Sequence, residues 1–204
     1  MIKMPEGENK LQIPFYRQTL PTSCGASCML MVGNYFSPEN FPLSFEQEHK
    51  INEQIRFWKG DEAGELENMA KLLRFARKNG FQVRYFLEGP QKNKIPEGME
   101  ESLWKRYLAS FFNVLEKERK KKGVTIIEHC NLEDFIEEIV KGRPIICEVQ
   151  FSGFITHCLV VRGFKGKMFY VIDPLKGYYR MHFQELSRVI NLDYMKNAVS
   201  LFKA

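Results

Sequence analysis

The sequence predicts an α+β fold in which an N-terminal helical layer packs on a C-terminal antiparallel sheet. Two observations lead to this prediction. Apolar residues recur at helical spacing from Cys24 to about Lys122, whereas short runs of β-branched and aromatic residues dominate from Val124 onward. The chain has 204 residues, of which 44% are hydrophobic, and this is enough to bury a core of its own.

Each expected helix combines a start signal with an apolar stripe. Ser44 followed by Gln47 is a capping-box pattern, and Asn131 is a good N-cap for the stripe after it. Gly80 is well placed to end the third helix, because glycine readily adopts the left-handed conformation that follows many helices. The expected helices begin at Cys24 and Ser44, run from about Ala63 to Asn79 and from about Glu100 to Lys122, and begin again at Asn131.

The expected strands are short and bounded by turn residues. The last three are separated by glycine-bearing turns, which predicts an antiparallel meander. The strands are expected at Phe81–Leu87, Val124–Ile127, Ile145–Gln150, Ile155–Arg162 and Met168–Ile172.

Linker composition and hydropathy predict the number of domains and the cellular location of the chain. No linker rich in proline, glycine or serine divides the chain, so we expect one domain over residues 1–204. Within it, residues 37–122 are expected to form a helical insert or lobe, and residues 124–204 the sheet-bearing half. No stretch approaches the roughly 20 apolar residues of a membrane span, and the first ten residues lack a signal-peptide apolar region. We therefore expect no membrane span and a cytoplasmic location.

The charge of the chain bears on whether it binds nucleic acid, and its cysteines bear on whether its thiols are reduced. The net charge of +5 is a mild excess that identifies no anion. The basic run Lys117–Lys122 has no interleaved aromatic residues and suits the C-terminal end of a helix, so we expect no nucleic acid partner. The 5 cysteines are an odd number without the dense spacing of a secreted disulfide scaffold, and we expect reduced thiols.

Cys24 is the candidate nucleophile. It stands where the polar segment Gln18–Ser23 passes into an apolar helix, so its thiol faces unpaired backbone N–H groups and the positive end of the helix dipole. Both lower the pKa of a thiol. Gly25 leaves room for a substrate backbone. The Gln18 side chain is close enough in sequence to return across the loop and form an oxyanion donor pair with the backbone N–H of Cys24.

His157 is the candidate base, and Asp173 is its expected partner. The two residues lie on successive strands and are equally distant in sequence from Lys165. If the hairpin is centred on Lys165, they are direct cross-strand neighbours with Cβ atoms about 5 Å apart. Asp173 can then hold the imidazole tautomer and stabilise the imidazolium, the orienting role in a nucleophile–base–orienter triad.

These residues, in this order, resemble the papain-like cysteine peptidases of family thirty-nine, which process bacteriocin leaders. The similarity rests first on Gln18, Cys24-Gly25-Ala26, His157 and Asp173-Pro174. It extends to short motifs before and after the histidine strand, Gly142–Ile146, Val160–Phe164 and Asp173–Gly177. The similar regions run from about Ile13 to Phe36 and from about Leu132 to Leu186.

The resemblance implies a papain-like fold and a thiol peptidase or amidohydrolase. In that family Cys24 corresponds to the nucleophile, His157 to the general base, Asp173 to the orienting acid and Gln18 to the oxyanion donor, and neither metal nor cofactor takes part. A peptide or amide substrate and an exporter or carrier-protein partner are implied as well. Two features depart from the family. Ser23 stands where members commonly carry an acidic residue, and leader peptidases are often fused to an exporter that this sequence lacks.

Two other functions remain open: acyl transfer from the same Cys24 acyl-enzyme, and a non-catalytic peptide-binding or zinc-binding module. A zinc site could draw on Cys24, Cys28, His157 and Cys158, but adjacent strand residues point to opposite faces and no CxxC pair is present. We expect Cys28 to pack in the core rather than to act as a resolving thiol. No part in the chemistry is expected for His49, His129, His182, Cys130 and Cys147.

Overall fold

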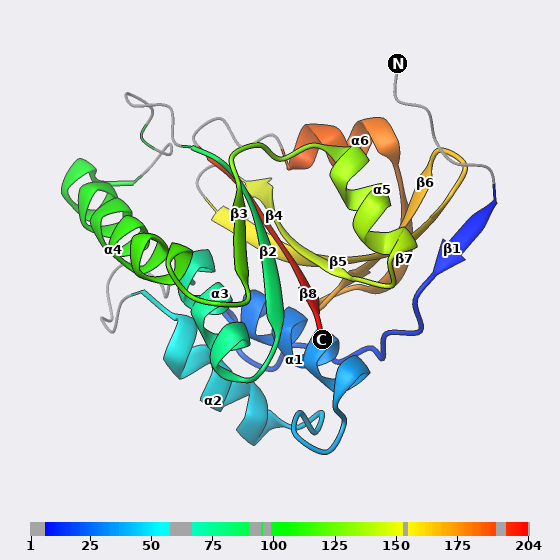
Figure 1. The fold of residues 1–204 in the computed structure, drawn as a ribbon, viewed down its shortest axis with the longest axis horizontal. Coiled ribbons are helices and arrows are strands. Elements are labelled where there is room, and N and C mark those ends of the chain that lie inside the picture. The colour runs from blue at the N-terminus through cyan, green and yellow to red at the C-terminus, as the bar shows by residue number, and fades with distance from the viewer. Residues whose placement is uncertain are drawn as a thin grey trace.

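The computed structural model describes residues 7–57, 67–89, 95, 99–152, 155–190 and 195–203 (Figure 1). The helices are α1 Cys24–Phe36, α2 Phe45–Ile55, α3 Met69–Lys78, α4 Glu101–Arg119, α5 Leu132–Val140 and α6 Phe183–Val189. The strands are β1 Glu8–Lys10, β2 Gln82–Glu88, β3 Val124–Ile127, β4 Ile145–Ser152, β5 Ile155–Lys165, β6 Met168–Asp173, β7 Gly177–His182 and β8 Lys196–Phe202.

All eight strands belong to a single sheet, with β1 paired to β5 beside the main path β3-β2-β8-β4-β5-β6-β7. The expected meander of three strands is confirmed, because β4, β5 and β6 pair antiparallel in succession, and β7, which was not among the expected strands, extends it by one more strand. The sequence analysis did not anticipate β8, which lies between β2 and β4. Through β8, the strand β2 from the middle of the chain joins the same sheet as the C-terminal meander.

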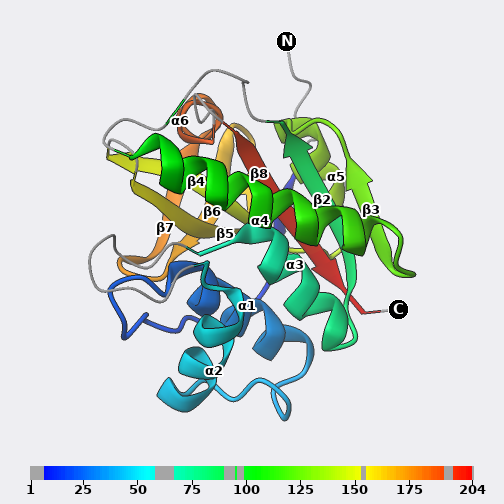
Figure 2. The same cartoon turned by 90° about the vertical axis from the view of Figure 1, so that its left-hand side faces the viewer.

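The predicted α+β class is confirmed. The prediction of one N-terminal helical layer is incomplete, however, because helices cover both faces of this sheet. On one face α1, α3 and α4 pack against alternate strand residues such as Val160 and Ile172 (Figure 1). On the other face α5 and α6 pack against the intervening residues, Leu159 and Val171 among them. Helix α4 also packs along α3 and β3 (Figure 2). The inner strands, such as β6 and β8, are therefore buried on both sides, whereas β1, β3 and β7 keep exposed residues.

Most element boundaries agree with the sequence, but α3 begins later than expected. The predicted helix begins near Ala63, which lies outside the described residues, whereas the observed helix begins at Met69. Asn68 ends the preceding extended segment because its side-chain oxygen caps the helix, accepting a hydrogen bond from the backbone N–H of Lys71 at 3.1 Å. Glu67 consequently lies before the helix, where it forms an isolated β-bridge with Arg56. This position brings Glu67 to the start of α1.

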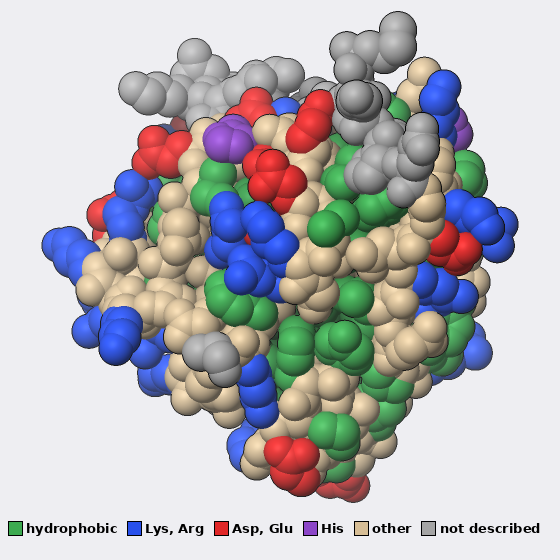
Figure 3. All heavy atoms as spheres, turned by 45° about the vertical axis from the view of Figure 1, so that its right-hand side comes forward, with side chains coloured by type: hydrophobic (Ala, Val, Ile, Leu, Met, Phe, Trp, Pro, Cys, Tyr) green, Lys and Arg blue, Asp and Glu red, His purple; other side chains and the backbone are tan. Residues whose placement is uncertain are grey.

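None of the described helices is long and apolar enough to cross a membrane. On the face drawn in Figure 3, basic side chains lie in several separate groups with acidic and apolar side chains between them.

Candidate active site

Cys24 is the first residue of α1, as the sequence predicts. The helix behind it is buried from Gly25 to Gly33, which fixes the backbone at the helix start. Cys24 as a residue remains partly exposed. Cys24 thus combines a rigid backbone, the positive end of a helix and access from solvent.

A buried carboxylate that the sequence analysis did not identify holds the loop before Cys24. Glu48 of α2 is 0% exposed, and its oxygens accept hydrogen bonds from Tyr16 Oη at 2.9 Å and from the backbone N–H of Thr19 at 3.0 Å. The hydroxyls of Ser23 and Ser27 donate to the same carboxylate. These hydrogen bonds outweigh the effect of burial and lower the pKa of Glu48. Glu48 therefore ties α2 to both sides of the nucleophile.

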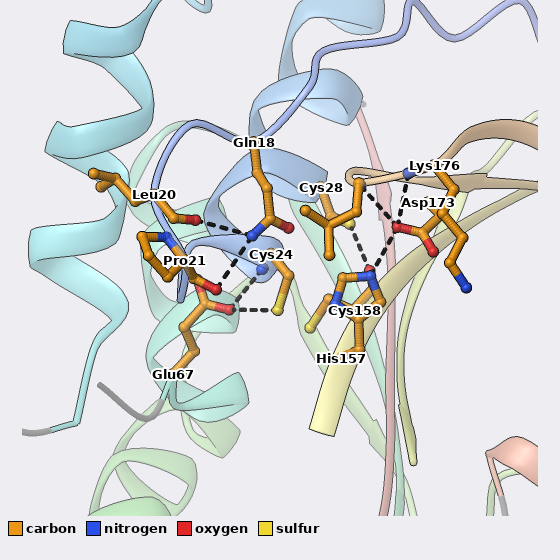
Figure 4. Close-up of polar contacts among 12 residues, drawn as sticks. Gln18, Leu20, Pro21, Cys24, Cys28, Glu67, His157, Cys158, Asp173 and Lys176 are labelled. Carbon is orange, nitrogen blue, oxygen red and sulfur yellow. Dashed lines mark hydrogen bonds and ion pairs between the residues drawn. The ribbon is translucent and has the colours of Figure 1, made fainter. Parts of the chain in front are cut away.

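Glu67 is a second carboxylate that the sequence analysis missed, and it touches the candidate nucleophile. Its oxygens accept hydrogen bonds from the backbone N–H groups of Gly25 at 2.6 Å and Ala26 at 2.9 Å, and Oε2 lies 3.3 Å from Cys24 Sγ (Figure 4). A Cβ atom at Gly25 would lie 2.6 Å from Oε2, so glycine is required for this approach. Burial, followed by the neighbouring Cys24 charge, raises the pKa of Glu67 well above its usual range.

His157 and Asp173 lie together, but not by the predicted pairing. His157 Nε2 is 2.9 Å from Asp173 Oδ1, and both side chains are buried. The prediction that they are direct cross-strand partners is wrong. The hairpin pairs Val160 with Ile172, so continuing the register by one residue places Asp173 opposite Leu159. His157 is two residues further along β5 on the same face, which makes the two a diagonal pair.

A β-bulge explains why His157 and Asp173 still share a face. Near the turn, Lys165 pairs with Met168 and Phe164 with Phe169; this register would place Asp173 opposite Val160, on the face away from His157. The register shifts between Val161 and Gly163, which moves the later pairs by one residue and restores the shared face. Arg162 is the bulged residue.

Contacts on both sides hold this bulge. The Arg162 guanidinium donates a hydrogen bond to the carbonyl of Leu11 at 2.9 Å, and the Arg162 carbonyl accepts one from the Leu11 N–H at 2.8 Å. The guanidinium also lies 4.5 Å from the ring centroid of Tyr178. The bulge that aligns His157 with Asp173 is therefore anchored to the N-terminal segment and to β7.

Hydrogen bonding to Cys158, opposed by burial and supported by His157, lowers the pKa of the Cys24 thiol well below its usual value. Burial alone lowers the pKa of His157, but its hydrogen bonds to Asp173 and Cys24 outweigh burial and raise that pKa to about 9. Burial alone would raise the pKa of Asp173. Its hydrogen bonds with His157 and with the backbone N–H of Leu175 outweigh this effect and lower the pKa. These opposite shifts favour a thiolate paired with an imidazolium.

Gln18 lies beside Cys24, although its amide hydrogens have other partners. Its Nε2 donates to the carbonyls of Leu20 at 2.9 Å and Pro21 at 3.3 Å (Figure 4). The backbone N–H of Gln18 donates to the carbonyl of Pro174 at 3.0 Å. This bond links the loop before the nucleophile to the residue that follows Asp173.

The remaining cysteines and histidines behave largely as expected. All five cysteines are free, and Cys28, Cys130, Cys147 and Cys158 are buried. The Cys28 thiol donates to the carbonyl of Cys158 at 3.4 Å, which fits core packing. The other histidines lie away from Cys24: His49 stacks on Phe45, His129 pairs with Asp134, and His182 caps α6.

Comparison with known proteins agrees with this arrangement. Residues 10–196 match the profile of the Peptidase_C39 like family. The chain belongs to this family. The match shows a cysteine peptidase with a papain-like fold, and it covers the middle of the chain that the sequence analysis left unassigned. A search of curated proteins finds no match.

Three similar solved structures share the family's fold. A double glycine motif protease from an AMS/PCAT transporter in complex with the leader peptide is 19% identical, with a TM-score of 0.54 over 96% of this chain and 95% of that one. A protein described as a C39-like peptidase from Bacillus anthracis is 12% identical, with a TM-score of 0.60 over 98% and 99%. The peptidase domain of Streptococcus ComA, a bi-functional ABC transporter involved in a quorum sensing pathway, is 13% identical, with a TM-score of 0.52 over 95% and 100%.

Glu48 also bears on the departure from the family pattern that the sequence analysis expected at Ser23. The Ser23 hydroxyl donates to the Glu48 carboxylate. A carboxylate is therefore present beside the residue before Cys24, but it comes from α2.

Proposed function

We propose that this peptidase cleaves a peptide or amide bond through an acyl-enzyme on Cys24. The observation that carries the proposal is the arrangement around His157. Its Nε2 is held by Asp173 at 2.9 Å, and its interaction with Cys24 helps to raise the His157 pKa to about 9. With Nε2 fixed on Asp173, Nδ1 is the ring nitrogen that exchanges a proton with the thiol and the substrate.

The proposed reaction has two steps. The Cys24 thiolate attacks the carbonyl carbon, and the His157 imidazolium gives its proton to the leaving amine as the C–N bond breaks. Water then attacks the thioester while His157 removes one of its protons, and the C–S bond breaks to regenerate the thiolate. Asp173 keeps the imidazole oriented and stabilises its positive charge in both steps.

Gln18 is the proposed oxyanion donor, together with the backbone N–H of Cys24. Its Nε2 donates to two backbone carbonyls in the free protein. We expect Nε2 to exchange the longer of these bonds, the 3.3 Å contact with Pro21, for the developing oxyanion. Glu48 supports this step indirectly, because it holds the adjacent Thr19.

The proposed substrate is a peptide with small residues next to the scissile bond. This proposal draws on the structural relative described as a double glycine motif protease and on the ComA peptidase domain of an ABC transporter. An exporter or a carrier protein that presents the peptide is the proposed partner. The five free thiols support a reducing, cytoplasmic location.

Cleavage of synthetic peptides containing a central Gly-Gly pair tests the function. The wild-type chain is expected to release two fragments, and heavy oxygen from labelled water is expected in the new carboxyl group. Cys24→Ala is expected to abolish cleavage, whereas Cys130→Ala, which removes a buried thiol elsewhere, should retain it. Equal cleavage by Cys24→Ala would contradict the proposal, and an amine adduct without labelled acid would indicate acyl transfer instead.

A further inference from the structure

Two potential metal ligands that have no role in the proposed peptidase reaction, Cys158 and Glu67, lie close to the thiol of Cys24. Cys24 Sγ, Cys158 Sγ and a carboxylate oxygen of Glu67 all lie within 4.8 Å of one another. We propose that these three side chains form a Zn²⁺ site that overlaps the peptidase centre, and that Zn²⁺ bound there reversibly blocks the nucleophile.

The spacing of the three groups suits a tetrahedral ion. With Zn–S bonds of about 2.3 Å and Zn–O bonds of about 2.0 Å, a tetrahedral site places neighbouring sulfur and oxygen ligands about 3.5 Å apart. Cys24 Sγ and Glu67 Oε2 are already 3.3 Å apart. Zinc can therefore enter with small side-chain movements, and water can fill its fourth position.

The types of donor favour zinc over other common cations. Ca²⁺ and Mg²⁺ prefer sites built from oxygen, whereas two thiolates with one carboxylate provide the mixed sulfur and oxygen donors that Zn²⁺ accepts. On binding, Zn²⁺ is coordinated by the Cys24 thiolate and displaces the proton of the Cys158 thiol, and any proton on the Glu67 carboxyl, to solvent. The reaction requires neither an oxidant nor a reductant.

The three groups come from separate elements that are each held in place. Cys24 begins α1, Cys158 lies within β5, and Glu67 precedes α3 (Figure 4). The backbone N–H groups of Gly25 and Ala26 hold the Glu67 carboxylate. Cys24 and Glu67 are partly exposed, which provides a route for the ion, while Cys158 is buried beneath them.

This site differs from the zinc arrangement considered from the sequence. Cys28 is not one of the three groups, because its thiol turns to the carbonyl of Cys158. His157 is not one of them either, because neither of its ring nitrogens belongs to the group of donor atoms that lie within 4.8 Å of one another. Glu67 is the ligand that a search for cysteine and histidine spacing could not find.

Zinc binding is tested by titrating the full chain with ZnCl₂ in a phosphine reductant, using a competing chromophoric chelator to measure affinity. One ion per chain is expected. Loss of a residue that only orients a metal ligand weakens metal binding about 10–100-fold. Loss of a ligand itself should cost at least as much, so Cys158→Ser and Glu67→Gln are each expected to weaken zinc binding at least tenfold. Cys130→Ser removes a buried thiol outside the cluster and is expected to bind zinc like the wild type. Far-ultraviolet circular dichroism confirms that each variant is folded.

Cobalt provides an independent readout, because Co²⁺ bound to thiolates gives an intense charge-transfer absorption that requires no substrate. This band is expected in the wild type and in Cys130→Ser, and weakened in Cys158→Ser. Zinc affinity that is equal in the wild type, Cys158→Ser and Glu67→Gln would overturn the proposed site. Metal binding is measured without peptide, so a failure here is distinguishable from a failure of the proposed peptidase reaction.

Discussion

Replacing Glu48 with alanine is expected to destabilise the fold and to slow catalysis, because this one carboxylate organises the loop that leads to Cys24. Its partners include the hydroxyls of Ser23 and Ser27, both 0% exposed. A buried donor left without an acceptor costs about 1–3 kcal/mol. Ser23 also reaches the carbonyl of Leu20 at 3.0 Å, which offsets part of its loss. We therefore expect Glu48→Ala to lower the free energy of unfolding by about 2–4 kcal/mol.

Two further variants make this prediction specific. Glu48→Gln keeps one acceptor oxygen, and hydroxyl partners can rotate to accept from the new amide, so a loss of about 1–2 kcal/mol is expected. Glu46→Gln removes a charge from the exposed side of the same helix and should have the smallest effect. Urea unfolding followed by fluorescence gives the free energies, and peptide cleavage gives kcat.

We expect kcat to fall at least about tenfold in Glu48→Ala, because small displacements of catalytic groups carry large kinetic costs. If Glu48→Ala unfolds at the same urea concentration as Glu46→Gln and cleaves peptide at the wild-type rate, the proposed positioning role of Glu48 is wrong.

Three further predictions concern the remaining groups around Cys24. Activity should follow a bell-shaped pH profile: it is lost as pH rises through the His157 pKa of about 9, and the acid limb lies well below the pKa of an ordinary thiol. The folded-state pKa of His157 is raised, so its contribution to stability is complete below about pH 6.5 and disappears as pH rises through about 9, which urea unfolding against pH measures. Asp173→Asn preserves the oxygen that accepts hydrogen bonds from His157 and from the backbone N–H of Leu175, so this variant should retain activity near neutral pH, with the alkaline limb of the profile moved to lower pH. Asp173→Ala removes that oxygen and should lose about 10²–10⁴-fold in kcat/KM. Equal losses in the two variants would contradict the orienting role of Asp173. Gly25→Ala should destabilise the fold by about 1–3 kcal/mol in urea unfolding, because its Cβ would lie 2.6 Å from a Glu67 oxygen, and an unchanged midpoint would contradict that packing.

Local signals in the sequence predicted a large part of the fold. The start of α1 at Cys24 and the Ser44 cap of α2 agree with the structure, as do the three strands of the meander. These features depend on residues close together in the chain. Strand β8 was not predicted, because its place between β2 and β4 depends on partners far away in the sequence.

The same distinction applies to the candidate site. His157 and Asp173 were chosen together from an assumed hairpin centre, and they are in contact although the assumed register is wrong. The bulge at Arg162 that restores their shared face has no clear local signal, because it depends on contacts with Leu11 and Tyr178.

The two glutamates were missed for a similar reason. Glu48 lies in a charged stretch of sequence that is typical of a solvated helix face, yet the fold turns it inward to five donor groups. The expected α3 helix included Glu67, whereas the structure places this residue in an extended segment before Met69. One weak signal was available for Glu48: Ser23 replaces the acidic residue common in the family, so a carboxylate from elsewhere could have been sought.

The rate at which iodoacetamide alkylates Cys24, measured against pH by peptide mass spectrometry, tests the thiolate–imidazolium pair most directly. Cys147 is an internal reference, because burial raises the pKa of its thiol. We predict that Cys24 reacts far faster than Cys147 at neutral pH, and that its rate levels off at a pH well below the pKa of free cysteine, because its thiol pKa is lowered. In His157→Ala, which loses one of the interactions that lower this pKa while the Cys158 contact remains, the rate should level off at a higher pH; an ordinary thiol gains about tenfold in rate per pH unit below its pKa. A wild-type Cys24 that keeps this tenfold rise up to the pKa of free cysteine, or one no more reactive than Cys147, would contradict the account.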